Sequence, residues 1–143
     1  MKEELLTIAL CLGMVACSGG KAGSSAESRQ TKKDVVEVLY FHGAQRCATC
    51  VAIEKNTKEL LDAAYVEPQN NGKLVFRSVD IAKEEALAEK YEVSWSSLVL
   101  VDYDKSGKEN AVNLTKFAFG NARKAPDKFK SGLSERITEM LNN

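Results

Sequence analysis

Two cysteines separated by two residues stand between a strongly apolar run and a helical pattern. The run covers residues 35–41, and the motif reads Cys47-Ala48-Thr49-Cys50. A near-continuous apolar run of this length is typical of a strand that is buried on both faces of a sheet. The start of the following helix would stabilise a thiolate, which is the reactive form of a cysteine. The sequence therefore predicts thiol–disulfide chemistry at a strand-to-helix junction.

The order of the predicted elements indicates a small α/β domain. Strands are predicted at residues 35–41, 73–79, 98–103 and 112–119. Helices are predicted from the cysteine motif to a break at residues 67–72, over residues 82–91 with Asp80 as N-cap, and from Pro126 to Leu141. Strand–helix–strand units imply parallel pairing, and a turn at residues 104–108 implies an antiparallel hairpin. The predicted order is β-α-β-α-β-β-α, a four-stranded mixed sheet with helices on both faces.

Residues 5–16 form an apolar run without charge. The run is too short to span a bilayer comfortably as a helix, but it suits the apolar region of a secretory signal. Its end, Val15-Ala16-Cys17, resembles a bacterial lipoprotein signal, in which cleavage precedes a cysteine that then carries lipid. A buried amphipathic helix is the alternative, but the run has no polar face.

The predicted domain organisation follows from that signal. Residues 1–16 are the lipoprotein signal peptide, residues 17–33 are the lipidated Cys17 and a flexible tether, and residues 34–143 are one domain. We therefore expect a protein of the cell envelope, anchored by lipid on the periplasmic face of a membrane. Cys47 and Cys50 would then be the only free thiols of the mature chain, too few for a structural disulfide framework.

Charge and motifs narrow the functional classes. The formal net charge is +0, which argues against an electrostatic nucleic-acid binder. We find no phosphate-cradling glycine loop, no serine-nucleophile motif and no catalytic pair of carboxylates, and we predict no cofactor. The expected partners are protein or small-molecule thiols and disulfides, together with a membrane through the lipid on Cys17.

The chain between residues 35 and 141 resembles the thioredoxin fold. A Cys-x-x-Cys motif follows the first strand, and Ser78-Val79-Asp80 resembles the end of the strand after the active-site helix. Residues 91–100 resemble the segment that carries the family's cis-proline, and Phe119-Gly120 resembles the apolar–glycine pair before the last helix. The resemblance implies a minimal thioredoxin-like fold and a thiol–disulfide oxidoreductase.

More narrowly, the chain is similar to a family of exported thioredoxin-like proteins. That family is named after a nitroreductase subunit for nitrophenyl compounds and after arsenic-resistance gene clusters. The similarity lies in Tyr40-Phe41-His42, in Arg46-Cys47-Ala48-Thr49-Cys50 and in Val93-Ser94-Trp95-Ser96-Ser97. The name supplies a genetic context and not a reaction.

Three departures from the thioredoxin pattern leave the redox poise open. Ala48-Thr49 stands where thioredoxins carry Gly-Pro, and the intervening pair influences the reduction potential. Ser97 aligns with the cis-proline. Because a cis bond before a non-proline residue costs roughly 3–4 kcal/mol, we expect a trans Ser96–Ser97 bond or a reshaped loop. Phe41 aligns with the buried acid that assists proton transfer to the second cysteine.

The two cysteines are expected to have different roles. Cys47, at the helix start and beside the cationic Arg46, is the expected attacking thiol. Cys50, one turn into the helix and more buried, is the expected resolving thiol. A static disulfide is the alternative. Arg46 either lowers the pKa of the thiol or holds an anionic substrate, or it is a solvated loop arginine.

Other candidate residues around the motif also have structural alternatives. His42 could shuttle protons or bind metal, or it could be a hydrogen-bonded histidine at a strand end. Trp95 could form the lip of a substrate groove beside Ser97, or it could pack partly buried. Four more residues are expected to be structural. Glu54 and Lys55 are expected to face solvent, and Phe117 and Phe119 are expected in the core.

The sequence is also compatible with two other functions, a soft-metal or arsenite-binding protein and a non-catalytic module. A vicinal dithiol binds trivalent arsenic or a soft cation well. A closed zinc site usually takes four ligands, however, and one chain offers two thiolates and His42. The second alternative is a non-catalytic thioredoxin-like interaction module, which would keep its function without either cysteine.

Overall fold

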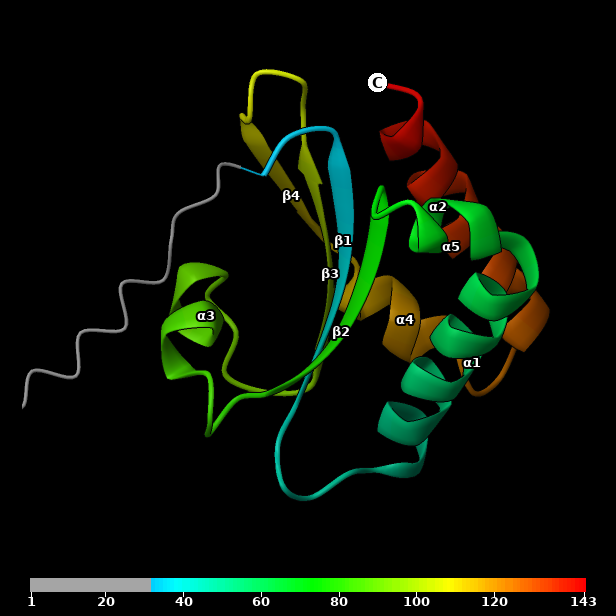
Figure 1. Ribbon diagram of the computed structural model, residues 1–143. Coiled ribbons are helices and arrows are strands. Elements are labelled where there is room, and N and C mark those ends of the chain that lie inside the picture. The colour runs from blue at the N-terminus through cyan, green and yellow to red at the C-terminus, as the bar shows by residue number, and fades with distance from the viewer. Residues whose placement is uncertain (1–31) are drawn as a thin grey trace, which may run out of the picture.

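A mixed sheet of four strands forms the centre of the domain (Figure 1). The structure is a computed structural model and describes residues 32–143. The strands are β1 (Val35–His42), β2 (Leu74–Asp80), β3 (Ser97–Tyr103) and β4 (Glu109–Asn113), in the spatial order β2-β1-β3-β4. β1 pairs in parallel with β2, whereas the β1–β3 and β3–β4 pairs are antiparallel. The predicted mixed sheet is confirmed.

Helices cover both faces of this sheet, as predicted. One face carries α1 (Ala48–Ala64), α2 (Val66–Asn70), α4 (Thr115–Asn121) and α5 (Pro126–Leu141), and the other carries α3 (Glu85–Lys90) (Figure 1). Pro126 is at the start of α5, where the missing N–H of a proline costs nothing. No helix within residues 32–143 is both long and apolar enough to cross a membrane.

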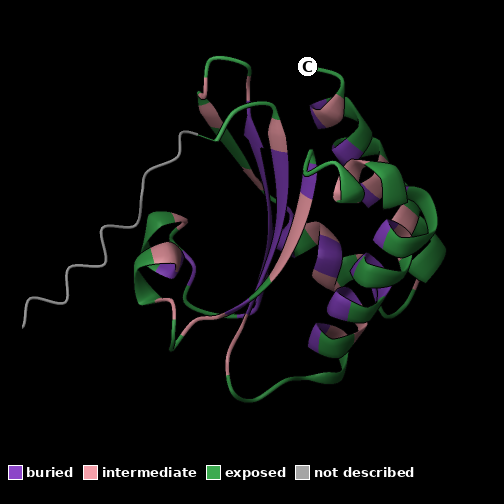
Figure 2. Cartoon of the chain, in the orientation of Figure 1, coloured by how far each residue is buried: buried purple, intermediate pink, exposed green. Residues whose placement is uncertain are grey.

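The apolar run of β1 is explained by two hydrophobic clusters on opposite faces of the sheet. Val36, Val38 and Tyr40 belong to the cluster under α1 and α5, and Leu39 and Phe41 belong to the cluster under α3. Successive side chains of a strand point to opposite faces, so a strand between two helical layers carries apolar residues on both faces. Figure 2 shows the central strands as the continuous buried layer between half-exposed helices.

The strand predicted at residues 112–119 is confirmed only at residues 112 and 113. β4 ends at Asn113, and residues 115–121 form α4. The Asn113 side chain accepts a hydrogen bond from the Thr115 N–H at 2.9 Å, which turns the chain out of the sheet. Leu114, Ala118 and Ala122 are buried at a spacing of four, which is helical spacing on one face. Burial on the α5 side therefore outweighs the local preference of the aromatic residues in this segment for a strand.

Two further boundaries differ from the prediction. The predicted break at residues 67–72 contains most of α2. Pro68 lies in the first turn of that helix, where a proline is tolerated. The chain turns only at Gly72, with φ +77°. α3 begins at Glu85 rather than at residue 82. Asp80 is not its N-cap, because its carboxylate accepts from the Ala82 N–H in the turn that follows β2.

The cysteine motif and the start of the described chain lie at opposite ends of β1. β1 begins next to Lys32 and ends at His42, and residues 43–47 lead into α1 (Figure 1). The Lys32 Nζ lies 2.6 Å from Oε1 of Glu37, a residue buried in β1. The predicted signal, Cys17 and the predicted tether up to residue 31 lie outside the described residues, so these remain predictions.

Candidate functional site: a disulfide at the start of α1

Cys47 and Cys50 form a disulfide at the first turn of α1. Cys47 is the N-cap residue, and its Sγ accepts a hydrogen bond from the Cys50 N–H at 3.0 Å. Free N–H groups at a helix start favour negative charge, and here one of them points at sulfur. Cys47 is exposed, whereas Cys50 is 5% exposed. A partner molecule can therefore reach one sulfur far more easily than the other.

The phenol of Tyr40 supports the disulfide from the side of β1. Tyr40 is fully buried, and its hydroxyl donates a hydrogen bond to the Cys50 carbonyl at 2.9 Å. The Arg46 guanidinium lies 5.8 Å from the centre of the same ring. Burial raises the pKa of Tyr40, and the Arg46 charge opposes only part of that rise. The phenol therefore stays a protonated donor at neutral pH.

Glu54 is buried and not solvent-facing, contrary to prediction. Its carboxylate pairs with Arg46 and also with Lys58, whose Nζ lies 2.8 Å from Oε1. Burial alone would raise the pKa of Glu54, but the hydrogen bonds from Lys58 and Arg46 outweigh it and hold the pKa below its ordinary value. Arg46 is therefore ion-paired on an exposed loop, and its effect on the thiol or on an anionic substrate stays a prediction. Lys55, by contrast, is exposed as predicted.

The loop before β3 keeps trans geometry where thioredoxins carry cis-proline. No peptide bond within residues 32–143 is cis, so the Ser96–Ser97 bond is trans, as expected. Ser97 is buried, pairs with Phe41 across β1 and β3, and donates its hydroxyl to the Trp95 carbonyl at 3.0 Å. Ser96, not Ser97, faces the disulfide.

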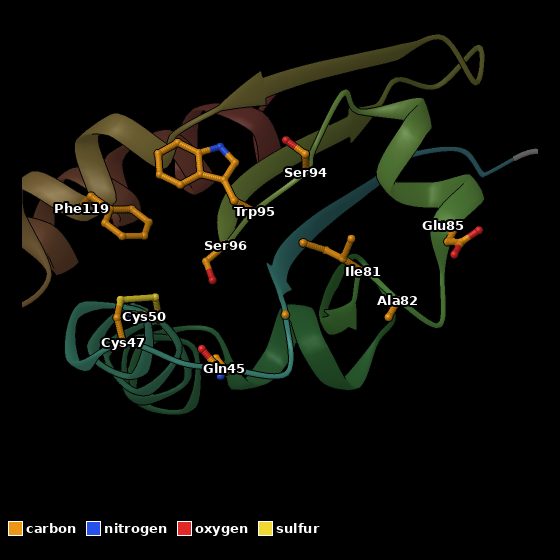
Figure 3. A pocket seen from close by; sticks show the side chains of 11 residues that line it. Gln45, Cys47, Cys50, Ile81, Ala82, Glu85, Ser94, Trp95, Ser96 and Phe119 are labelled. Carbon is orange, nitrogen blue, oxygen red and sulfur yellow. A yellow bond between two sulfur atoms is a disulfide. The ribbon is translucent and has the colours of Figure 1, made fainter.

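A cavity of about 460 Å³ adjoins the disulfide (Figure 3). Ile81, Trp95 and Phe119 supply its apolar walls, and Gln45 and Ser96 supply polar groups. Trp95 is 63% exposed and stacks on Phe119 with the ring centres 5.7 Å apart. Trp95 therefore lies at the rim of a groove and is not a partly buried packing residue.

Phe119 is the aromatic residue of this cavity that the sequence placed elsewhere, and Gln45, Ile81 and Glu85 were not predicted to line it either. Phe119 was expected in the core, but it is half-buried, and it reaches the cavity from α4 (Figure 3). Phe117 is also only half-buried, packed on Phe129 with 5.9 Å between ring centres. The helical spacing of Leu114, Ala118 and Ala122 is the signal that could have placed Phe119, because it turns the predicted strand into a helix.

His42 lies apart from the cysteines. It is the last residue of β1, with Nδ1 3.1 Å from the Gly43 carbonyl oxygen and its ring 6.0 Å from that of Tyr40. It does not line the cavity at the disulfide. Within residues 32–143, no three or more His, Cys, Asp and Glu side chains form a group that could hold a metal ion. The geometry therefore matches the strand-end interpretation of His42.

Solved structures resemble this chain, although no protein-family model and no curated protein sequence matches it. The Trx4 domain of ERdj5 is 14% identical, with 76% of this chain and 81% of that chain covered and a TM-score of 0.51. A thioredoxin from Fasciola hepatica is 24% identical, with 76% and 83% covered and a TM-score of 0.47. Trxlp from Edwardsiella tarda EIB202 is 17% identical, with 70% and 82% covered and a TM-score of 0.45. Together with the sheet order and the disulfide position, the first of these shows that the chain has a thioredoxin-like fold.

Proposed function

We propose that this protein is a thiol–disulfide oxidoreductase that works through Cys47 and Cys50. The observation that carries the proposal is the asymmetry of the pair. An exposed sulfur at a helix N-cap adjoins an open cavity, and a buried sulfur lies one turn further along the helix. A disulfide that serves stability alone has no need of a cavity beside its exposed sulfur.

The exchange proceeds in two balanced steps. The Cys47 thiolate attacks one sulfur of a substrate disulfide, which forms a mixed disulfide and releases one substrate thiolate. The Cys50 thiolate then attacks the Cys47 sulfur, which closes the Cys47–Cys50 disulfide and releases the second substrate thiolate. Two electrons pass from the dithiol to the substrate. The reverse sequence oxidises a substrate dithiol.

Mixed-disulfide trapping tests this assignment. We expect Cys50→Ser to accumulate a covalent complex with a protein disulfide substrate, because the step that releases the partner is lost. We expect Cys47→Ser to form none and to lose at least about 100-fold in turnover, since the remaining sulfur is buried. Equal trapping by both variants would contradict the assignment. Full function in the double serine variant would instead establish an interaction module.

We further propose that the protein is a lipid-anchored protein of the cell envelope. The support is the sequence Val15-Ala16-Cys17 after an apolar run, together with a disulfide pair, which persists outside the cytosol more readily than inside it. Metabolic labelling with a fatty acid tests the proposal. We expect label on the wild-type chain and none on Cys17→Ser. Label that persists in Cys17→Ser would overturn the anchor.

A further inference from the structure

A second cavity, of about 530 Å³, lies behind the wall of the first one. Trp95 and Phe119 line both cavities, so the stacked pair of rings is a shared wall. The second cavity contains neither cysteine, and the exchange steps described above do not use it. Its remaining lining includes Ser97, Thr115 and Lys116.

The floor of the second cavity is held in place by hydrogen bonds. The Thr115 hydroxyl accepts from the Leu98 N–H at 3.1 Å, and the Asn113 side chain accepts from the Thr115 N–H at 2.9 Å. Ser97 is buried and donates to the Trp95 carbonyl. These bonds tie the start of α4 and the loop before β3 to the sheet, so the cavity is already formed without a ligand.

The chemistry of the cavity suits a peptide. Trp95 is the most exposed large apolar side chain within residues 32–143, and its ring offers an apolar face beside Phe119. Lys116 is exposed and makes no ion pair among the described residues, and the Asn113 amide is exposed as well. Both can donate to peptide carbonyl oxygens. The Glu92 carboxylate also lines the cavity and can accept from a peptide N–H, so one apolar wall lies beside both donors and an acceptor. This combination fits a large apolar side chain on a peptide backbone.

The second cavity shares a wall with the cavity at the disulfide, and this favours a polypeptide over a small disulfide as the substrate. A small disulfide that reacts with Cys47 needs only the first cavity, which is the one of the two that adjoins the cysteines. A polypeptide that crosses the Trp95–Phe119 wall occupies both cavities at once. The exposed ring of Trp95 is then covered in the complex, which explains why it is placed beside a reactive sulfur.

We propose that the second cavity is a subsite that selects polypeptide substrates with a large apolar side chain a few residues from the reactive cysteine. The proposal rests on the proposed exchange activity and names its substrate class. The substrate cysteine lies in the first cavity, its chain crosses Trp95 and Phe119, and the apolar side chain lies against their far side. Selection occurs at the attack step and leaves the electron balance unchanged.

Peptide kinetics on the full chain test the subsite. The substrates are peptide disulfides in which a single leucine is moved from one to five residues away from the cysteine, with an all-glycine peptide as reference. We expect one spacing to raise kcat/KM about tenfold over the glycine peptide, as expected for one apolar side chain in a pocket. Glutathione disulfide is the small-molecule comparison and should have a lower kcat/KM than that peptide.

Filling the cavity tests its location. Lys116→Trp places an indole in the second cavity from an exposed position, and we expect the leucine-to-glycine ratio of kcat/KM to fall to about 1. Lys128→Trp is the matched control on the exposed surface of α5, outside both cavities, and should keep the ratio. Each leucine-to-glycine ratio of kcat/KM is measured on a single variant. A general loss of activity in that variant therefore cancels from the ratio.

The outcomes separate the subsite from the proposed function. Absence of turnover on every disulfide would overturn the exchange activity itself. Turnover without any leucine preference, or a preference that Lys116→Trp leaves intact, would overturn the subsite alone. A higher kcat/KM for glutathione disulfide than for every peptide would assign the site to a small molecule.

Discussion

At the scale of single residues, the ion pair between Glu54 and Arg46 is the charged contact next to Cys47 in the sequence. Arg46 precedes the exposed cysteine directly, and its guanidinium is held between the Tyr40 ring and the Glu54 carboxylate. The sequence resemblance aligns Phe41 with the buried acid of thioredoxins, and in this structure Glu54 is the buried carboxylate that contacts Arg46. It reaches the site from α1, on the other side of the sheet from Phe41.

Glu54→Gln should make the dithiol more oxidising. Without the carboxylate, the charge of Arg46 favours the Cys47 thiolate and hence the reduced form. We expect the pKa of the Cys47 thiol to fall and the reduction potential to rise by about 30 mV, a tenfold change in the exchange equilibrium. The measurements are alkylation rate against pH and equilibration with glutathione. Glu59→Gln, an exposed glutamate of the same helix, is the control. An unchanged potential in Glu54→Gln would show that Arg46 does not act on the thiol.

The pH dependence of stability follows from the sign of the shift at Glu54. Its pKa is lowered on folding from an ordinary value of 4.5, so its ionised form stabilises the folded state above that pH. The contribution is lost as the pH falls through the lower, folded pKa. Urea unfolding of wild type and Glu54→Gln should therefore differ by about 1 kcal/mol at pH 7 and converge in acid. A difference that persists undiminished well below pH 4 would contradict this assignment.

The cysteine motif could be predicted from sequence because its chemistry is local. A Cys-x-x-Cys pair at a strand-to-helix junction needs only neighbouring residues to be recognised. Glu54 and Phe119 could not be placed in the same way. Glu54 is buried where Arg46, eight residues earlier, pairs with it, and Phe119 reaches the cavity from α4, which leaves the sheet after Asn113. Both depend on contacts between segments that local patterns do not encode.

At the scale of elements, β1, β3 and α5 agree with the predicted segments because their burial and their sequence period coincide. β1 and β3 are buried along nearly their whole length, and α5 buries Phe129, Leu133 and Ile137 at helical spacing. α4 is different. Its two phenylalanines favour a strand locally, but its buried positions are set by packing on α1 and α5. The strand prediction failed where tertiary packing outweighed local propensity.

The contact between α4 and α5 can be tested at Gly132. A Cβ added there would lie 2.5 Å from Cζ of Phe117, so Gly132→Ala must displace that ring. We expect a net loss of about 1 kcal/mol, because overpacking exceeds the gain in helix propensity. In a Phe117→Ala background the same change should stabilise by about 0.5–1 kcal/mol. A double-mutant cycle from urea unfolding measures both values. Equal effects in the two backgrounds would mean that α4 does not pack as described.

At the scale of the whole molecule, the disulfide and the start of the described chain lie at opposite ends of β1 (Figure 1). Lys32 was predicted to belong to the tether, but it contacts the buried Glu37 and lies over the ring of Tyr103. The folded unit therefore extends at least to Lys32. If the proposed anchor at Cys17 holds, this arrangement directs the reactive end of the sheet away from the tether.

Truncation locates this boundary. A chain that begins at Lys32 should keep the melting temperature and the reduction potential of the full chain, because the Lys32–Glu37 pair survives. A chain that begins at Val35 loses that partner and leaves a buried carboxylate unpaired. Because Lys32 is half exposed, we expect this chain to lose about 1 kcal/mol in the free energy of unfolding. Thermal and urea unfolding of both chains are the measurements, and equal stability of the two would place the boundary after Lys32.

The reduction potential of the Cys47–Cys50 pair tests the proposed exchange most directly. The full chain is equilibrated in glutathione buffers of graded composition, and the fractions of dithiol and disulfide are counted by thiol alkylation. An exchange protein should show a single two-electron transition at about −120 to −270 mV, the range of thiol–disulfide oxidoreductases. A disulfide that stays closed below about −300 mV, as structural disulfides do, would contradict the proposed function.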